Sequence, residues 1–344
     1  MSGARHFPRS TIPGRFPGAE ALLLTAALCG AHELATAPAR AADPAPYPNR
    51  QITMVVPFGA GTQIDTAARL VAGKLADALA QPVVVENVPG ASGNLGGRQV
   101  ARSKPDGYTL LFTGSLITLL PLTMGSAAVD PLVSYAPVAK LAEPPAVILV
   151  SAKPGVSTLS DLLERARRTP GGIAYATAGV GSIHHFAMSL VALKADAPML
   201  HVPYGNSAQA RQDLLSGEVP VYVTSLGPLN PYLESGQVRA LAVMRERRVS
   251  AFPDVPTIVE LGFPQAAMAP WNGVLAPAGT PPAVIARLNA EFARIVMLPD
   301  VRERFTQMGM EPLSPSPEAF AAEIREAVAR WPRVIRESGV VLAK

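Results

Sequence analysis

The stretch PFGAGTQIDTAAR, residues 57–69, joins an apolar run to an amphipathic helix, and the interpretation of the chain starts from it. Apolar residues at 51–56 predict a strand, small residues at 59–61 predict a tight loop, and Thr62 is suited to cap a helix. The first turn of a helix has free N–H groups and the positive end of the helix dipole. Such a junction is either an anion site or a tight turn that binds nothing.

The composition favours a soluble globular protein with two domains. The chain has 344 residues, of which 49% are hydrophobic and 16% charged, which is sufficient for packed cores. The net charge is +4, from 30 basic and 26 acidic side chains. Four arginines and two glutamates lie in the first 42 residues, and no basic run with interleaved aromatic residues follows. Nucleic-acid binding is therefore not expected.

The N-terminus predicts an export signal over residues 1–42. Three arginines precede the apolar segment 21–29, and small residues follow that suit cleavage near Ala41 or Ala42. Cleavage there would remove Cys29, the only cysteine, so that no disulfide is expected in the mature protein. The alternative is a tail that remains disordered or in the membrane. The expected location is outside the cytoplasm.

From residue 51 onward, short apolar runs alternate with amphipathic segments. Strands are expected at 52–58, 82–87, 108–114, 136–142 and 146–152, with helices at 62–80 and 93–101. A second cycle has helices at 158–168, 182–194, 206–216 and 228–235 between strands at 172–178, 199–204, 219–225 and 238–244. A return strand within 270–281 precedes helices at 282–295, 298–308 and 316–338. Such alternation predicts an α/β fold of two units, with a parallel sheet in the first, and a ligand cleft at the carboxyl ends of the strands.

A second loop, ATAGVGSIHH at 176–185, repeats the pattern of the first. Two glycines and Ser182 lie between an apolar run and a helix. His184 occupies the position of the third glycine of a dinucleotide fingerprint, so that no nucleotide cofactor is predicted. Ser182 and His185 are three residues apart, which leaves a serine hydrolase as an alternative, although no acidic partner is evident. The histidines lack the spacing of a metal site.

Further strand ends carry hydroxyl groups. Thr113 and Ser115 follow one strand, and Tyr204 and Ser207 follow another. These residues either donate hydrogen bonds into the cleft or act as helix caps and packing residues. Asp65 either contacts a cationic part of a ligand or accepts N–H bonds within its own loop, and the supporting role is favoured. Several donor-rich strand ends without a matched nucleophile, base or metal set favour binding over catalysis.

The chain resembles the tripartite tricarboxylate transporter solute-receptor family, the Bug-type periplasmic binding proteins. The opening, YPNRQITMVVPFGAGTQIDTAARLVAGKLADALAQPVVVENVPGASGN at 47–94, is similar to the family pattern P-F-x-P-G-G-x-x-D-x-x-A-R followed by Q-P-V-V-V-E-N-x-P-G-A-G-G-N. The later matches are PDGYTLL at 105–111, G-x-G-S-x-x-H at 179–185, HVPYGNSAQARQDLLSGEV at 201–219, GQVRALAV at 236–243, FPDVPT at 252–257 and LAPAGTP at 275–281. The ordered set covers nearly all of the expected mature chain.

The resemblance implies a two-lobed, Venus-flytrap receptor that closes on a small carboxylated solute. In the family, the loops that match 58–62 and 179–182 hold a ligand carboxylate from opposite lobes, largely through N–H groups and water. Asp65 and Arg69 match a family pair that is interpreted as structural. The chain departs from the family at positions that bear on ligand selectivity, which are Ala60, Gly61 and Thr62, Ser189, Gly205 and Asn206, and Val223, Thr224 and Ser225.

These expectations define a candidate site and its partners. Lobe 1 is expected to combine residues 46–144 with 270–344, and lobe 2 to span 145–269, with hinges near 141–147 and 265–271. The residues expected at the solute site are Phe58, Gly59, Ala60, Gly61, Thr62, Asp65, Ser92, Thr113, Ser115, Gly179, Gly181, Ser182, Tyr204, Ser207, Thr224 and Ser225. The expected partner is the membrane part of a tripartite carrier, or alternatively the periplasmic domain of a sensor kinase. No cofactor, metal or catalytic residue is expected.

Overall fold

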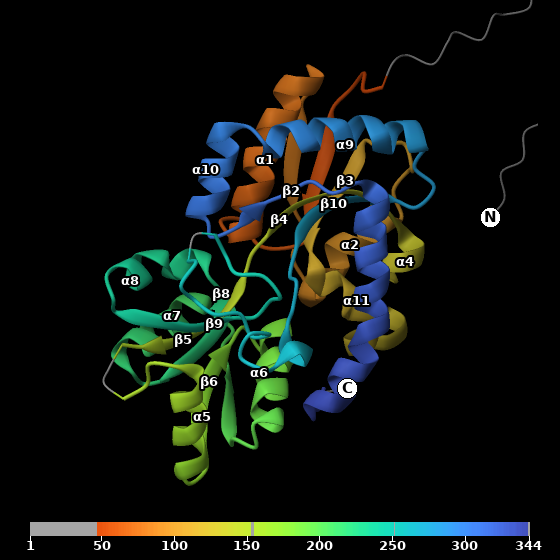
Figure 1. Cartoon of the computed structure of the whole chain (residues 1–344). Coiled ribbons are helices and arrows are strands. Elements are labelled where there is room, and N and C mark those ends of the chain that lie inside the picture. Colours follow the sequence, from red (N-terminus) through yellow and green to blue (C-terminus); the bar gives the residue numbers. More distant parts are fainter. Residues whose placement is uncertain (1–46, 153–154, 251, 343–344) are drawn as a thin grey trace, which may run out of the picture. The chain divides into compact units, whose positions relative to one another are not determined.

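The computed structural model describes residues 47–152, 155–250 and 252–342, within a unit that begins at residue 46. The predicted export signal and its cleavage near Ala41 or Ala42 lie outside the described residues. The described residues build two β-sheets, each flanked by helices (Figure 1). None of the helices in this part of the chain is both long and apolar enough to cross a membrane.

The first sheet has the strand order β11-β4-β10-β3-β1-β2. Its strands are β1 (Ile52–Val56), β2 (Val83–Asn87), β3 (Thr109–Gly114), β4 (Tyr135–Glu143), β10 (Asn272–Pro277) and β11 (Glu311–Pro312). The first three strands are parallel, whereas β10 lies antiparallel between β3 and β4. The parallel sheet expected from the strands at 52–58, 82–87 and 108–114 is confirmed. Strand β10 is antiparallel because it returns from the second sheet in the opposite direction.

Helices cover both faces of the first sheet. They are α1 (Gln63–Leu79), α2 (Asn94–Ala101), α3 (Leu120–Met124), α4 (Pro131–Ser134), α9 (Pro282–Val296) and α10 (Pro299–Gln307). Successive side chains of β1 point to opposite faces. Met54 and Val56 accordingly pack with α1 and α9 in one apolar cluster, whereas Val55 packs with α2 in another. Buried on both sides, β1 holds its carboxyl end, and hence the loop that follows, in a fixed place.

The second sheet has the order β7-β6-β8-β5-β9. Its strands are β5 (Ala146–Ser151), β6 (Ile173–Thr177), β7 (Met199–Pro203), β8 (Val221–Ser225) and β9 (Val238–Val243), and its helices are α5 (Leu159–Arg168), α6 (Ile183–Lys194), α7 (Ser207–Ser216) and α8 (Asn230–Glu234). Strands β6, β7 and β8 are parallel, and β5 is antiparallel to β8 and β9. On β5, Ile148 packs with α5 and α6, and Leu149 packs with α7 on the opposite face.

The chain passes between the sheets twice, and the last helix contacts both halves. Strand β4 continues through residues 144–145 into β5, and residues 244–271 lead from β9 to β10. Helix α11 (Pro317–Ser338) places Phe320 in a core of the first sheet and Trp331 in the core of the second. Trp331 Nε1 also donates to Thr118 Oγ1 at 2.8 Å. Helix α11 therefore links the two halves in addition to the two crossings (Figure 1).

Candidate functional site

The loop between β1 and α1 is held by the third residue of the helix. Thr62 caps α1 by accepting the N–H of Asp65, and the Asp65 carboxylate accepts the N–H of Gly61 at 2.8 Å. Asn87 Nδ2 and Arg69 Nε donate to the same carboxylate at 2.8 and 3.1 Å. Burial alone would raise the pKa of Asp65, which is 2% exposed, but these hydrogen bonds outweigh it and lower the pKa. The predicted supporting role of Asp65 is confirmed.

The loop between β6 and α6 is built in the same way. Ser182 caps α6 by accepting the N–H of His185, and His185 Nδ1 accepts the N–H of Gly181 at 3.3 Å. The hydroxyl of Thr177, at the end of β6, accepts the N–H of Gly179 at 3.1 Å. Asp65 and His185 thus occupy equivalent places, since each is the third residue of its helix and each accepts the N–H of the glycine before the cap.

These contacts show which N–H groups of the two loops are free. Gly61, Gly179 and Gly181 have φ angles of 79°, 131° and 75°, which favour glycine, and their N–H groups are bonded inside the loops. Within the described chain, the N–H groups of 59, 60, 63 and 64 in the first loop have no protein partner, and neither do those of 180, 183 and 184 in the second. The glycines therefore shape the loops, while neighbouring residues provide the free donors.

Several predicted residues of the first lobe line one open cavity of about 280 Å³. Phe58, Thr62 and Ser115 belong to this lining, which also includes Gln63, Ile64, Gly114, Leu116, Pro144, Pro270, Trp271 and Asn272. Ser92 is exposed next to Gly93, where an added Cβ would lie 3.4 Å from the Phe58 ring. Thr113 is only 3% exposed and lies within β3.

The second-lobe residues lie outside the lining of that cavity. Tyr204 donates its hydroxyl to Asp213 at 2.6 Å, and burial together with Asp213 raises its pKa to about 12. Ser207 is exposed at the start of α7, and Thr224 and Ser225 are half-buried at the end of β8. The structure thus groups part of the predicted first-lobe set and leaves the second-lobe set apart from it.

Two close approaches nevertheless join the loops of the two sheets. An added Cβ at Gly227, just after β8, would lie 2.7 Å from Gln63 Nε2 at the start of α1. An added Cβ at Gly181 would lie 2.9 Å from Leu342 and 4.0 Å from Thr123 in α3. Both loops of the predicted site therefore lie where the two halves of the structure meet.

The geometry of Ser182 and His185 differs from that of a nucleophile and its base. The Ser182 hydroxyl accepts the backbone N–H of His185 and donates to Thr177 Oγ1 at 3.4 Å. The ring of His185 is bonded to Gly181 instead and stacks on His201, with 3.6 Å between the ring centroids. Burial, followed by the neighbouring His201, lowers the pKa of His185 to about 4. Ser182 and His185 thus stabilise the loop conformation, and no hydrogen bond joins the His185 ring to the serine hydroxyl.

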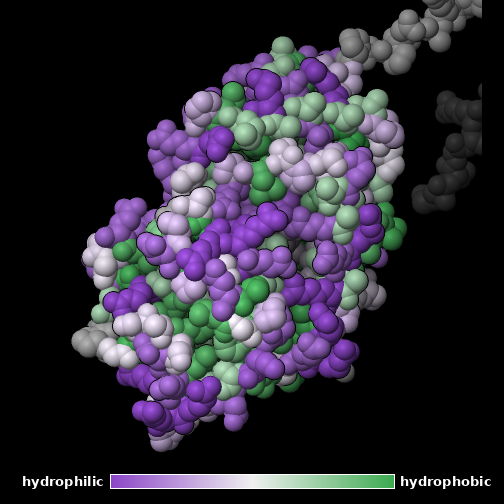
Figure 2. Space-filling model, viewed as in Figure 1, coloured by the Kyte–Doolittle hydropathy of each residue, from purple (hydrophilic) through white to green (hydrophobic). Residues whose placement is uncertain are grey.

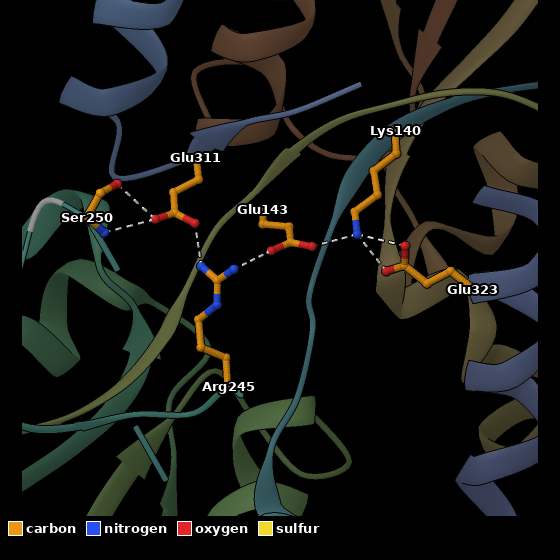
Figure 3. Close-up of polar contacts among 6 residues, drawn as sticks. All are labelled: Lys140, Glu143, Arg245, Ser250, Glu311 and Glu323. Carbon is orange, nitrogen blue, oxygen red and sulfur yellow. Dashed lines mark hydrogen bonds and ion pairs between the residues drawn. The ribbon is translucent and has the colours of Figure 1, made fainter. Parts of the chain in front are cut away.

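Sequence reasoning missed a charged network between the two crossings (Figure 3). Lys140, in the apolar strand β4, is 4% exposed and donates to Glu143 at 2.6 Å and to Glu323 at 2.7 Å. Arg245, just after β9, donates to Glu143 at 2.7 Å and also to Glu311. The space-filling view shows hydrophilic residues across the middle of this face (Figure 2). A lysine inside an otherwise apolar strand was the one signal available in the sequence.

A cavity of about 320 Å³ adjoins this network and is lined by Lys140, Glu323, Arg330 and Trp331 among others. Its charged groups are largely bonded within the protein, since Lys140 pairs with Glu323 and Arg330 donates to two backbone carbonyls. In the part of the chain that the structure describes, no group of three or more His, Cys, Asp or Glu side chains is placed to hold a metal ion.

Comparison with known proteins identifies the family. A family model described as "Tripartite tricarboxylate transporter family receptor" (TctC) matches residues 67–340. Protein BugT of Bordetella pertussis is 35% identical over 302 residues, which cover 86% of this chain and 91% of BugT.

Two solved structures are also similar. Rpa4515 of R. palustris with adipate is 32% identical, with a TM-score of 0.76 over 86% of this chain and 99% of that chain. MatC (Rpa3494) of Rhodopseudomonas palustris with bound malate is 32% identical, with a TM-score of 0.71 over 84% of this chain and 100% of MatC.

The family model begins within α1, after the loop at 57–62, and extends to residue 340. The solved structures confirm the predicted α/β fold with two lobes. The chain belongs to the tripartite tricarboxylate transporter receptor family of solute-binding proteins.

Proposed function

We propose that this protein is a periplasmic receptor that captures a small carboxylated solute between its lobes and delivers it to a tripartite carrier. The observation that carries the proposal is the pair of equivalent helix starts, α1 and α6, one on each sheet. Each start directs free N–H groups and the positive end of a helix dipole toward the junction between the sheets. A carboxylate is one of the small anions that such donors bind. The adipate and malate bound to two relatives support this class of ligand.

The solute site would be divided between two lobes. Lobe 1 comprises 46–144 and 270–344, and lobe 2 comprises 145–269, with bending near 141–147 and 265–271. The cavity beside Phe58, Thr62 and Ser115 would be the first-lobe half of the site. Its open position suits a receptor in which the second-lobe residues approach when a solute binds. Ser92, Thr113, Tyr204, Ser207, Thr224 and Ser225 remain proposed contacts that affinity measurements on single variants would test.

The experiment is a thermal-shift screen of the purified protein after unfolding and refolding to remove bound solute. The panel comprises mono-, di- and tricarboxylates, amino acids and aromatic acids. A ligand at 100 times its dissociation constant adds roughly 2.7 kcal/mol of stability. Replacing Gly59 by proline removes a free N–H from the first loop at a position where no atom lies within 4 Å of an added Cβ, and the variant should lose the shift while remaining folded. No response to any acid in the panel would contradict the proposal.

The receiving partner has two alternatives. A carrier predicts that uptake of the labelled acid into cells requires both this protein and the membrane subunits. A sensor kinase predicts instead that the loaded receptor changes kinase phosphorylation without uptake. The family description favours the carrier.

A further inference from the structure

His185 can take the place that Asp65 has in the first loop only in one protonation state. The N–H of Gly181 donates to His185 Nδ1 at 3.3 Å, just as the N–H of Gly61 donates to Asp65 Oδ2 at 2.8 Å. A carboxylate accepts hydrogen bonds at every oxygen, but an imidazole nitrogen accepts only when it carries no proton. His185 must therefore be neutral, with its proton on Nε2, for the loop to have this conformation.

The surroundings of His185 favour that state. The ring is 8% exposed, and it lies almost parallel to the His201 ring, with an interplanar angle of 12°. A charged His185 would be buried against a second imidazole, which is unfavourable. The titratable rings in contact with it, among the described residues, are His201 on β7 and Tyr175 on β6, and neither carries a negative charge at neutral pH.

His201 contacts Thr177, the residue that supports the other glycine of the loop. His201 Nε2 lies 2.7 Å from Thr177 Oγ1, and that oxygen accepts the N–H of Gly179. When His201 is neutral at Nε2, the Thr177 hydroxyl can donate to it and still accept from Gly179. Protonation of His201 would turn Nε2 into a donor, and the threonine hydroxyl would then donate to the Gly179 carbonyl, which lies 3.2 Å away. The bond from the Gly179 N–H therefore does not depend on the charge of His201, whereas the bond from the Gly181 N–H depends on that of His185.

We propose that His185 is a positioning residue of the solute site, which holds the loop at 179–182 in its binding conformation only while its ring is neutral. This inference rests on the proposed function, because the loop matters for affinity only if it holds the solute. It assigns the second lobe a pH-dependent support that the first lobe, with Asp65, does not have.

The test compares two substitutions at one position. His185→Ala removes the acceptor and should weaken binding of the acid found in the screen by about tenfold. His185→Asn keeps a neutral acceptor near Nδ1 and should recover most of that loss. Asp161→Ala is the matched control, since Asp161 is the third residue of α5 and accepts the N–H of Ser157 at 2.9 Å, away from the predicted site. The control should retain wild-type affinity.

A second readout needs no ligand. In ¹⁵N NMR spectra of the wild-type protein at pH 7.5, His185 should show an unprotonated Nδ1 and a protonated Nε2. On acidification, the amide signal of Gly181 should shift together with the His185 ring. A proton on Nδ1 at pH 7.5 would overturn the inference even if the protein binds acids. A Gly181 amide chemical shift that does not change as the His185 ring titrates would overturn it as well. Folded Asn and Ala variants with the same reduced affinity would also overturn it. A wild type that binds no acid would instead refute the proposed function, and the NMR result would still decide the role of His185.

Discussion

Replacing Lys140 by methionine should destabilise the fold strongly and in a pH-dependent way. The ammonium group is 4% exposed and lies 2.7 Å from both oxygens of Glu323 and 2.6 Å from Glu143. Methionine preserves most of the side-chain volume but leaves the Glu323 carboxylate, whose side chain is 29% exposed, without its cation. Glu143 keeps its bond to Arg245. The loss therefore falls mainly on one carboxylate.

The magnitude follows from breaking one partly buried ion pair. Removing one partner of a buried pair costs about 3–5 kcal/mol, and partial exposure of Glu323 places the loss near the lower end, about 3 kcal/mol at pH 8. Burial already raises the pKa of Glu323, against the opposing effect of Lys140, and loss of the lysine should raise it further. A raised carboxyl pKa means that the cost is largest above that pKa and shrinks as the group binds a proton. The loss should accordingly be smaller at pH 5 than at pH 8.

Urea denaturation at the two pH values measures this effect, with an expected shift of about 1 M in the midpoint at pH 8. Lys74→Met is the matched control, because Lys74 pairs with Asp300 at the surface and its removal should leave the midpoint almost unchanged. Adding Glu323→Gln to the Lys140 variant should restore part of the stability at pH 8. An equal loss at both pH values, or no loss at either, would show that the network does not carry the energy assigned to it.

Four further outcomes are expected. Asp65→Ala should lower the free energy of unfolding by about 2–4 kcal/mol in urea denaturation, because it deprives three donors of their acceptor. Gly181→Ala should cost about 1–2 kcal/mol in the same assay, since the φ of 75° is unfavourable for a residue with a Cβ. Between pH 6.5 and 4 the wild type should lose up to about 3 kcal/mol relative to His185→Asn, because the unfolded chain binds a proton at that histidine and the folded chain resists it until about pH 4. By calorimetric titration, His185→Asp should bind a carboxylate more weakly than His185→Asn, since no arginine stands one turn later, where Ser189 lies.

The sequence predicted the elements well because strands and caps are local features. The first helix was expected at 62–80 and spans Gln63–Leu79, with Thr62 as its cap as predicted. The expected strand 52–58 ends at Val56, since Pro57 cannot donate to a ladder. Strand direction was predicted less well. Strand β10 is reached only after the whole second sheet, so its antiparallel place between β3 and β4 depends on a chain path that periodicity does not encode.

The local features of the candidate site were predicted from the sequence, but its long-range contacts were not. Both loops and the support from Asp65 followed from residue types at helix starts. The bond from Gly181 to His185 was missed because histidine is an unusual acceptor at that position, and the sequence had suggested a nucleophile and base instead. The network of Lys140 and Glu323 joins residues 183 positions apart, which no local pattern reveals.

The two loops use different acceptors for their internal N–H groups, one charged and one neutral. Each needs an acceptor for an internal N–H, yet a net negative charge beside the free donors would repel a carboxylate. In the first loop the acceptor is charged, and Arg69 balances it at 3.1 Å. In the second loop the acceptor is an uncharged imidazole, so that no counter-ion is needed, but the acceptor exists only while His185 is neutral. The first loop therefore stays formed over a wide pH range through an ion pair, and sensitivity to acid is confined to the second lobe. In the proposed site a solute needs both loops, so the loop that contains His185 would set the lower pH limit of binding.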